Sequence, residues 1–406
     1  MSLTVGASRE ARARRSLIVV LAAATFLFWA SLYVYVPILP VYAESLGASL
    51  SMVGIVVASY AIAQLTLRIP IGVWADRLGR RKPFVVAGFV FAALGGLGLA
   101  LAPNPWMLFA ARAVTGIAAA TWVATTVFFA SNFPPRETAR AMGIIAFING
   151  AAQVAASLVG GFTAQAFGWQ ATFWLGMALA LGAMPLLLFA PERRTSTPRP
   201  FSPHEFLKVS TVPVLLVISG LAALGQFVSQ GVNIGFVPVY GAKIGATKAE
   251  LGLILTVMFA AASLGSLAAA YLGERLGLAR IQAAGFLLMA GGTLAVPFVH
   301  SVWLLGATQA VSGLGRGFFL PIQMAVSIQA VPQEQRATAM GVFQATYSIG
   351  MLLGPLLSGL LADRFGIASL FYVSAGIALL CAVASATPQV ARLVARSTRA
   401  AASARG

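Results

Sequence analysis

Charged residues are scarce in this sequence, and acidic ones are the scarcest. Only 9% of the 406 residues are charged, with 10 Asp and Glu against 27 Lys and Arg. The single cysteine, Cys381, can form no internal disulfide, and the two histidines add no cluster that would hold a metal ion. We therefore expect neither a metal nor another cofactor.

The acidic residues are also absent from the places where a membrane enzyme would need them. All ten carboxylates and both histidines fall in polar segments or at the ends of long apolar runs. Buried acids and imidazoles are common general acids and bases, so a membrane-embedded hydrolase or transferase would lack its catalytic group. The sequence therefore argues against an enzyme.

Long apolar runs are what the sequence has in abundance. It is 59% hydrophobic, its mean hydropathy is +0.88, and runs of about 20 residues, enough to cross a bilayer as a helix, recur along its length. These features predict an all-α polytopic membrane protein with twelve transmembrane helices. The predicted spans are 17–39, 51–72, 84–102, 106–131, 141–163, 171–190, 211–236, 250–272, 281–299, 302–328, 339–361 and 368–386.

The basic residues predict which side of the membrane each loop faces. If the N-terminus is cytoplasmic, 21 of the 27 Lys and Arg lie on that side, 3 lie on the other side and 3 lie within spans. This is a positive-inside signal, so we expect both termini in the cytoplasm and a multi-pass protein of the cytoplasmic (inner) membrane. The basic residues are spread over many loops and face anionic lipid, so we expect no nucleic-acid partner. A cleaved signal peptide would also begin with basic residues, but the first apolar run is too long for one.

An internal repeat divides the spans into two sets of six. Shifting the sequence by 198 residues aligns four separate loops, which indicates two halves of common ancestry with the same membrane orientation. Two such bundles enclose a cleft that opens to either side by rocking, as in a transporter. We predict an N-terminal six-helix bundle over 1–190, a cytoplasmic linker over 191–210, a C-terminal six-helix bundle over 211–390 and a basic cytoplasmic tail over 391–406.

The segment GVWADRLGRRKP (72–83) concentrates charge between two spans. It resembles the loop 2–3 signature of the major facilitator superfamily, and AYLGERLGLAR (270–280) is a weaker copy at the equivalent place in the second half. The resemblance covers essentially the whole chain and implies the major facilitator fold, two pseudo-symmetric six-helix bundles. It also implies a loop that latches the halves in the outward-open state, although the basic cluster could instead serve only to fix topology. The latch residues would be Gly72, Asp76, Arg77, Gly79, Arg80, Arg81 and Lys82.

Three arginines fall inside predicted spans, where a charge should face the bundle interior or water. Arg112, in RAVTG, resembles the family's basic motif of the fourth span, which is linked to proton transfer; a structural hydrogen bond is the alternative. Arg68 lies near the cytoplasmic end of its span, where it would join the latch, snorkel to the interface or contact substrate. Arg316, flanked by glycines in GLGRGFFLP, lies deeper and is a candidate for the cavity.

Amide and aromatic side chains on several spans complete the candidate substrate site. Gln226, Gln230 and Asn233 are spaced to share one face of an α-helix, which predicts a polar stripe toward water or toward partner helices. Each aromatic could equally be ordinary packing. The other candidates for substrate binding or coupling are Tyr33, Trp122, Asn149, Gln153, Gln323, Gln344 and Tyr347.

Glycine and proline give a mixed signal about the direction of transport. Exporters of the drug:proton antiporter group carry a Gly-Pro pattern in the fifth span, which here reads GAAQVAASLVGG (150–161) without it. The eleventh span, SIGMLLGPLLSG (348–359), has the pattern instead. We expect close helix packing or bending at Gly350, Gly354, Pro355 and Gly359.

The sequence thus predicts a secondary-active transporter that resembles the drug:proton antiporter group and moves a small organic solute by alternating access, in the direction of efflux. Its expected partners are that solute, the lipid bilayer and protons, and we expect a monomer. The main alternative is a carrier of organic anions that uses the buried arginines, because expelling a monoanion from a negative interior gains about 2.3 kcal/mol per 100 mV. A lipid carrier and a non-transporting sensor or membrane enzyme are further alternatives.

Overall fold

The computed structural model describes residues 2–134, 137–188, 192, 203–332 and 335–394. Twelve helical stretches within these residues are long and apolar enough to cross a membrane, as predicted. The helices are α1 (Ser2–Tyr33), α2 (Leu39–Ser45), α3 (Leu50–Leu78), α4 (Lys82–Ala100), α5 (Pro105–Ala120), α6 (Trp122–Ala130), α7 (Thr138–Phe167), α8 (Trp169–Leu188), α9 (Pro203–Ser210), α10 (Pro213–Val228), η2 (Ser229–Ile234), α11 (Val237–Lys243), α12 (Lys248–Leu276), α13 (Leu278–Ala295), η3 (Val296–Phe298), α14 (Val302–Gln329), α15 (Arg336–Phe365) and α16 (Ile367–Ala386).

The turns between helices repeat along the chain with the predicted offset. Among the described residues, six glycines have a positive φ, a conformation that residues with a Cβ rarely adopt. They form three pairs separated by 198 residues, Gly47 with Gly245, Gly79 with Gly277 and Gly168 with Gly366. The repeat seen in the sequence is therefore a repeat of backbone conformation at the ends of equivalent helices.

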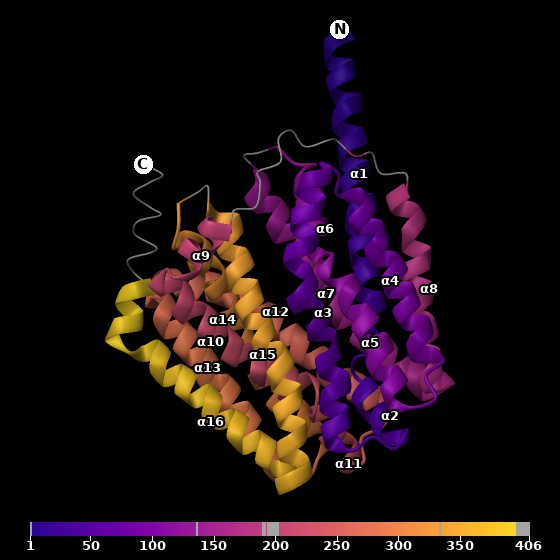
Figure 1. Cartoon of the computed structure of the whole chain (residues 1–406), viewed down its shortest axis with the longest axis vertical. Coiled ribbons are helices and arrows are strands. Elements are labelled where there is room, and N and C mark those ends of the chain that lie inside the picture. The colour runs from indigo at the N-terminus through magenta and orange to yellow at the C-terminus, as the bar shows by residue number, and fades with distance from the viewer. Residues whose placement is uncertain (1, 135–136, 189–191, 193–202, 333–334, 395–406) are drawn as a thin grey trace.

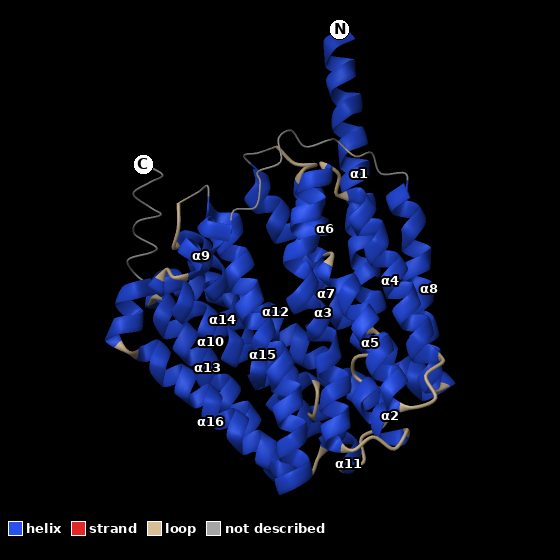
Figure 2. Ribbon diagram, in the orientation of Figure 1, coloured by secondary structure: helices blue, strands red, loops and turns tan. Residues whose placement is uncertain are grey.

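The helices form two bundles that lie side by side (Figures 1 and 2). The N-terminal half contains α1 to α8, and the C-terminal half contains α10 to α16. We call the end where α2 contacts α11 the gate end, and the opposite end, where α3 is followed by α4, the basic end. At the gate end the two halves meet, and toward the basic end their helices diverge.

Buried apolar side chains show the same arrangement. In the described part of the chain they form three clusters. One cluster at the gate end contains residues of both halves, such as Val56 and Phe259. Toward the basic end each half has largely its own cluster, one built around Phe128 and the other around Phe343, with Met351 of α15 as the one buried C-terminal residue in the first. The apolar core shared by the halves is therefore most extensive toward the gate end.

The first helix of each half is broken in the middle, at equivalent positions. α1 stops at Tyr33 instead of continuing to residue 39 as predicted, and residues 34–38 form turns before α2. Pro37 and Pro40 lack the N–H groups that a continuous helix needs there. In the second half, the break is the π-helical turn η2 between α10 and α11.

This π turn changes one prediction about the site. The α-helical spacing of Gln226, Gln230 and Asn233 does not apply, because Gln230 and Asn233 lie in η2, where more residues fill each turn. Gln226 and Asn233 are buried and Gln230 is partly buried, which agrees with amides directed toward partner helices, one of the two directions we predicted.

The predicted linker and tail lie largely outside the described residues. Within the linker, residues 203–210 form the short helix α9, and Glu192 is described on its own. The domain boundaries at 190, 210 and 390 stay predictions.

Candidate substrate site

Two pairs of helices join the halves at the gate end, and each pair meets at glycines. A Cβ on Gly161 of α7 would lie 2.7 Å from the Cα of Gly252 in α12. In the equivalent pair, a Cβ on Gly54 of α3 would lie 3.3 Å from the Cα of Gly359 in α15 and would overlap the Pro355 carbonyl. The backbones approach this closely because glycine has no side chain.

A helix cap closes each of these two contacts. Asp363 near the end of α15 accepts hydrogen bonds from the backbone N–H groups of Leu50 (3.0 Å) and Ser51 (2.8 Å) at the start of α3. Gln165 near the end of α7 accepts one from the backbone N–H of Lys248 (3.2 Å) at the start of α12. We call these contacts, with their glycine pairs, the α3–α15 seam and the α7–α12 seam.

The α7–α12 contact continues from the seam toward the basic end as far as Gly150. Gly150 and Ser263 still lie close, with 3.2 Å between a Cβ on Gly150 and the Ser263 Oγ. Toward the basic end from this level the helices of the two halves diverge (Figure 1).

Arg112 is enclosed by the N-terminal half. Its guanidinium lies over the ring of Tyr60, 4.2 Å from the centroid, and 5.6 Å from the centroid of Tyr35. Its Nη1 donates a hydrogen bond to the Thr115 Oγ1 (3.3 Å). Two aromatic faces and a hydroxyl thus compensate this charge, mainly as cation–π contacts.

Arg68 connects the two halves in the middle of the α3–α15 pair. Its Nη1 donates a hydrogen bond to the hydroxyl of Tyr347 (2.8 Å), and its Nη2 donates one to the Gln64 Oε1. Arg68 is buried, so it does not snorkel toward the interface, which was one of our interpretations. Its side chain instead turns inward, where a polar partner on α15 meets it.

Arg316 lies in the middle of α14 and is partly buried. No described residue forms a hydrogen bond or an ion pair with its guanidinium, and its Nε is buried without a partner. Tyr33 and Tyr347 are the ionisable side chains that interact with it electrostatically, one from each half. Its charge is therefore the least compensated of the three.

A row of aromatic rings runs from the N-terminal half to the C-terminal half beside these residues. Trp122 packs edge-on against Trp29 (5.1 Å between centroids), Trp29 packs against Tyr33 (5.9 Å), and Tyr33 packs edge-on against Phe259 of α12 (5.6 Å). Tyr33 and Trp122 were predicted for the site, whereas Phe259 and Tyr60 were missed because their contacts arise only when the helices pack.

The amide candidates are not gathered into one cluster. Gln153 donates a hydrogen bond to Asn149 on the same helix, α7. Gln323 is fully buried in α14, and neither polar atom of its amide has a partner. Gln344 is partly buried, beside Tyr347 in sequence but without its contact to Arg68.

The predicted latch segment is anchored to Glu192, a residue of the predicted linker. The backbone N–H groups of Arg81 and Lys82, at the start of α4, donate to a carboxylate oxygen of Glu192. Gly79 has a positive φ of 62°, Arg77 and Arg80 are exposed, and the side chain of Asp76 lies outside the described residues. A Cβ on Gly72 would lie 3.5 Å from a side-chain carbon of Val123, an ordinary contact, so no backbone approaches Gly72 closely in this conformation.

The glycines of the eleventh span lie at two different contacts. Gly350 and Gly354 pack against the backbone of α10, at Ala223 and Phe227. Gly359 belongs to the α3–α15 seam, and the Pro355 carbonyl faces Gly54 there. These residues therefore lie at close helix contacts of the kind that the pattern predicts.

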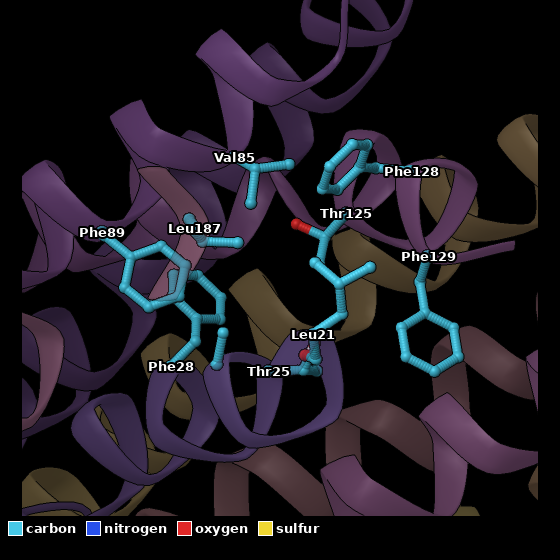
Figure 3. Close-up of a pocket in the computed structure, with 10 residues that line it drawn as sticks. Leu21, Thr25, Phe28, Val85, Phe89, Thr125, Phe128, Phe129 and Leu187 are labelled. Carbon is cyan, nitrogen blue, oxygen red and sulfur yellow. The ribbon is translucent and has the colours of Figure 1, made fainter. Parts of the chain in front are cut away.

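A small pocket lies inside the N-terminal half rather than between the halves (Figure 3). It is lined mostly by apolar side chains, and the two threonine hydroxyls on its wall donate to carbonyls of their own helices. Its volume of about 10 Å³ holds roughly one water molecule, so it is a packing defect and no substrate site. The lining residues are Leu21, Ala24, Thr25, Phe28, Val85, Phe89, Thr125, Phe128, Phe129 and Leu187.

A family model described as the Major Facilitator Superfamily matches residues 21–243 and 216–403. The chain belongs to the Major Facilitator Superfamily. This confirms the resemblance drawn from GVWADRLGRRKP, and it agrees with a transporter rather than an enzyme.

Two curated relatives in this superfamily are named as efflux proteins. The multi-drug resistance efflux pump PmrA of Streptococcus pneumoniae serotype 4 is 26% identical over 360 residues, which cover 86% of this chain and 90% of PmrA. The multidrug resistance protein MdtG of Citrobacter koseri is 24% identical over 375 residues, which cover 89% of this chain and 91% of MdtG.

Solved structures of the superfamily share the fold. A mutant form of the nucleoside transporter NupG has a TM-score of 0.77 at 15% identity, covering 91% of this chain and 98% of NupG. A bacterial homologue of the human lysosomal transporter Spinster, in an inward-facing and unoccupied conformation, has a TM-score of 0.75 at 18% identity, covering 95% of this chain and 97% of that one. These likenesses confirm the predicted two-bundle fold.

The sequence analysis missed the residues of the seam caps, although a signal for them was present. Gln165 and Asp363 are separated by 198 residues, and so are Leu50 and Lys248. Each cap residue therefore has its repeat equivalent in the other seam. The offset alone could have paired these positions, but only the packing shows that α7 meets α12 and α3 meets α15.

Proposed function

We propose that this superfamily member exports a small organic solute from the cytoplasm by alternating access. The observation that carries the proposal is the core that is shared by both halves at the gate end and, apart from Met351 of α15, separate for each half toward the basic end. The excess of Lys and Arg favours a cytoplasmic basic end, so this conformation would be open to the cytoplasm. The efflux names of the relatives support the outward direction.

The substrate would enter from the basic end and bind between the halves near Tyr33, Tyr347 and Arg316. Rocking would then part the two seams at the gate end and bring the basic ends together. The segment 72–83 would act in that second state as the latch that the superfamily's signature implies. Gly72 would find its close neighbour only then, which agrees with its loose contact here.

Proton coupling is part of this proposal, with Arg112 and Asp76 as the residues to test. The protein would act as a monomer in the cytoplasmic membrane. A lipid carrier would use the same gate, so lipid probes belong in the transport panel.

A reversible cross-link tests whether the gate must open. We would replace Leu50 and Asp363 with cysteine in a Cys381→Ser background and follow export into inside-out vesicles. Oxidation should abolish transport, and reduction should restore it in the same preparation. A cross-link between Gln282→Cys and Ser385→Cys, whose native side chains hydrogen-bond within the C-terminal half (2.9 Å), should leave transport intact. Full transport by the cross-linked gate would overturn the proposed cycle.

A further inference from the structure

The three buried arginines differ in how their positive charges are compensated. Arg112 has two aromatic faces and a hydroxyl, and Arg68 has a tyrosine hydroxyl and an amide oxygen. Arg316 has neither a hydrogen bond nor an ion pair from the described residues. Its Nε is buried without a partner, whereas its two terminal nitrogens are not among the buried polar atoms of this partly buried side chain.

The position of Arg316 fits a substrate that both halves contact. Tyr33 of the N-terminal half and Tyr347 of the C-terminal half are its electrostatic neighbours. The Tyr347 hydroxyl is already the acceptor for Arg68, and the Tyr33 ring packs between Trp29 and Phe259 in tilted and edge-on contacts. The residue that lacks a partner therefore lies where a ligand would touch α1, α14 and α15 together.

Among the described residues, no carboxylate interacts with this charge. The described Asp and Glu side chains lie in loops or near helix ends, whereas Arg316 lies in the middle of α14. An unpaired charge at membrane depth is costly, so water or a ligand must supply the compensation. A guanidinium with free terminal nitrogens matches a carboxylate or a similar planar oxyanion, which it binds through two parallel hydrogen bonds.

We propose that the substrate is an aromatic monoanion whose acidic group binds Arg316. The aromatic body would lie against the row of rings formed by Trp29, Tyr33 and Phe259, where edge-to-face contacts are available. We expect one negative charge on the substrate because Arg316 is a single guanidinium without a hydrogen bond or ion pair from the described residues. Lipophilic cations would be repelled by the same guanidinium. This inference rests on the proposed function, because it assigns the class of the exported solute.

Three probes of matched shape separate charge from hydrophobicity. They are 2-naphthoate, its neutral amide 2-naphthamide and the cation 2-naphthylmethylammonium, titrated against the purified full-length protein in detergent. We expect 2-naphthoate to bind with a Kd at least about tenfold lower than that of the amide, as a charge-assisted pair would give. Equal affinity for anion and amide, tighter binding of the cation, or no binding of any probe would overturn the proposal.

Variants assign the difference to one residue. Arg316→Gln should raise the Kd of 2-naphthoate by about tenfold or more and leave the Kd of the amide nearly unchanged, because only the charge is lost. The Kd of 2-naphthoate for Arg316→Lys should lie between the values for the parent protein and for Arg316→Gln. Arg280→Gln, a change at an exposed arginine of α13, is the matched control and should change neither value. Equal losses for anion and amide in Arg316→Gln would make Arg316 structural. The comparison of the three probes on the parent protein stands even if a variant folds poorly.

Transport distinguishes the inference from the proposed function. Inside-out vesicles should accumulate 2-naphthoate. Accumulation of the amide or the cation without the anion would keep the proposed export and overturn the substrate class. Binding of the anion to Arg316 without transport of any probe would keep the site and overturn export.

Discussion

The two seams at the gate end are equivalent by sequence but differ in chemistry. Both have a glycine pair and a side chain that caps the opposite helix, at positions separated by 198 residues. In the α3–α15 seam the cap is the carboxylate of Asp363, which accepts two N–H groups, and Arg68 adds a second cross-half bond. In the α7–α12 seam the cap is the neutral amide of Gln165 with one N–H group.

The comparison separates what the backbone shape contributes to the closed gate from what the charged groups contribute. The glycines set how closely the helices approach, and this requirement is the same in both seams. The caps only satisfy free N–H groups at a helix start, a task that either a carboxylate or an amide performs. Shape should therefore dominate the stability of the closed gate, and charge should distinguish one seam from the other.

Filling the glycine contacts should have the largest effect. Gly161→Leu and Gly54→Leu should each destabilise the closed gate by about 3 kcal/mol, the upper part of the range for overpacking, because backbone atoms would have to move. Spin labels across the gate end should report longer distances. Gly182→Leu, at a position with nothing within 4 Å, is the control. An unchanged distance distribution in both seam variants would show that the glycines do not set the closure.

Removing the cross-half hydrogen bond of Arg68 should have the next largest effect. Tyr347→Phe should lower the free energy of unfolding by about 2 kcal/mol, because a bond to a charged donor is lost and the donor stays buried. Tyr372→Phe, at an exposed tyrosine of α16, should change it little. The thermal midpoint in detergent measures both, and similar midpoints for the two variants would count against the role of Tyr347.

The caps should have smaller and unequal effects. Asp363→Ala should cost about 1 kcal/mol, as loss of an N-cap does, and Gln165→Ala about half of that, since one neutral bond is lost. High salt should reduce the difference by screening the exposed carboxylate. Equal costs, or a difference that salt does not change, would mean that charge does not separate the seams.

Glu44 should give the gate a weak dependence on pH. This residue lies on α2, which contacts α11, and burial raises the pKa of its carboxyl, while Lys243 on α11 partly counteracts that rise. The protonated form is then favoured in the folded state, so stability should increase as pH falls through the raised pKa and be lost as pH rises through it. Glu44→Gln should remove this dependence, measured as the thermal midpoint between pH 4 and 7, about the range in which a raised carboxyl titrates. A slope that persists in this variant would assign it to another group.

The sequence was sufficient for the parts of the structure that follow from hydropathy and repetition. The twelve spans, the two halves and the family are confirmed, because each span must bury an apolar surface and each half repeats the other. The α-helical spacing assumed for Gln226, Gln230 and Asn233 was wrong because residues 229–234 form a π turn, which cannot be read from the sequence. The partners of the buried arginines could not be predicted from the sequence either. Tyr60 lies 52 residues before Arg112 and Tyr347 lies 279 residues after Arg68, so only the folded helices bring them together.

The crossed arrangement of the seams has a consequence for how this gate could change over time. Each seam combines a cap from one half with a helix start from the other. In a symmetric pair of identical six-helix chains, any substitution would appear in both seams at once. Once the two copies are fused in one chain, a substitution alters a single seam. A charged cap at position 363 can therefore coexist with a neutral one at position 165, and natural selection can tune the two sides of the gate independently.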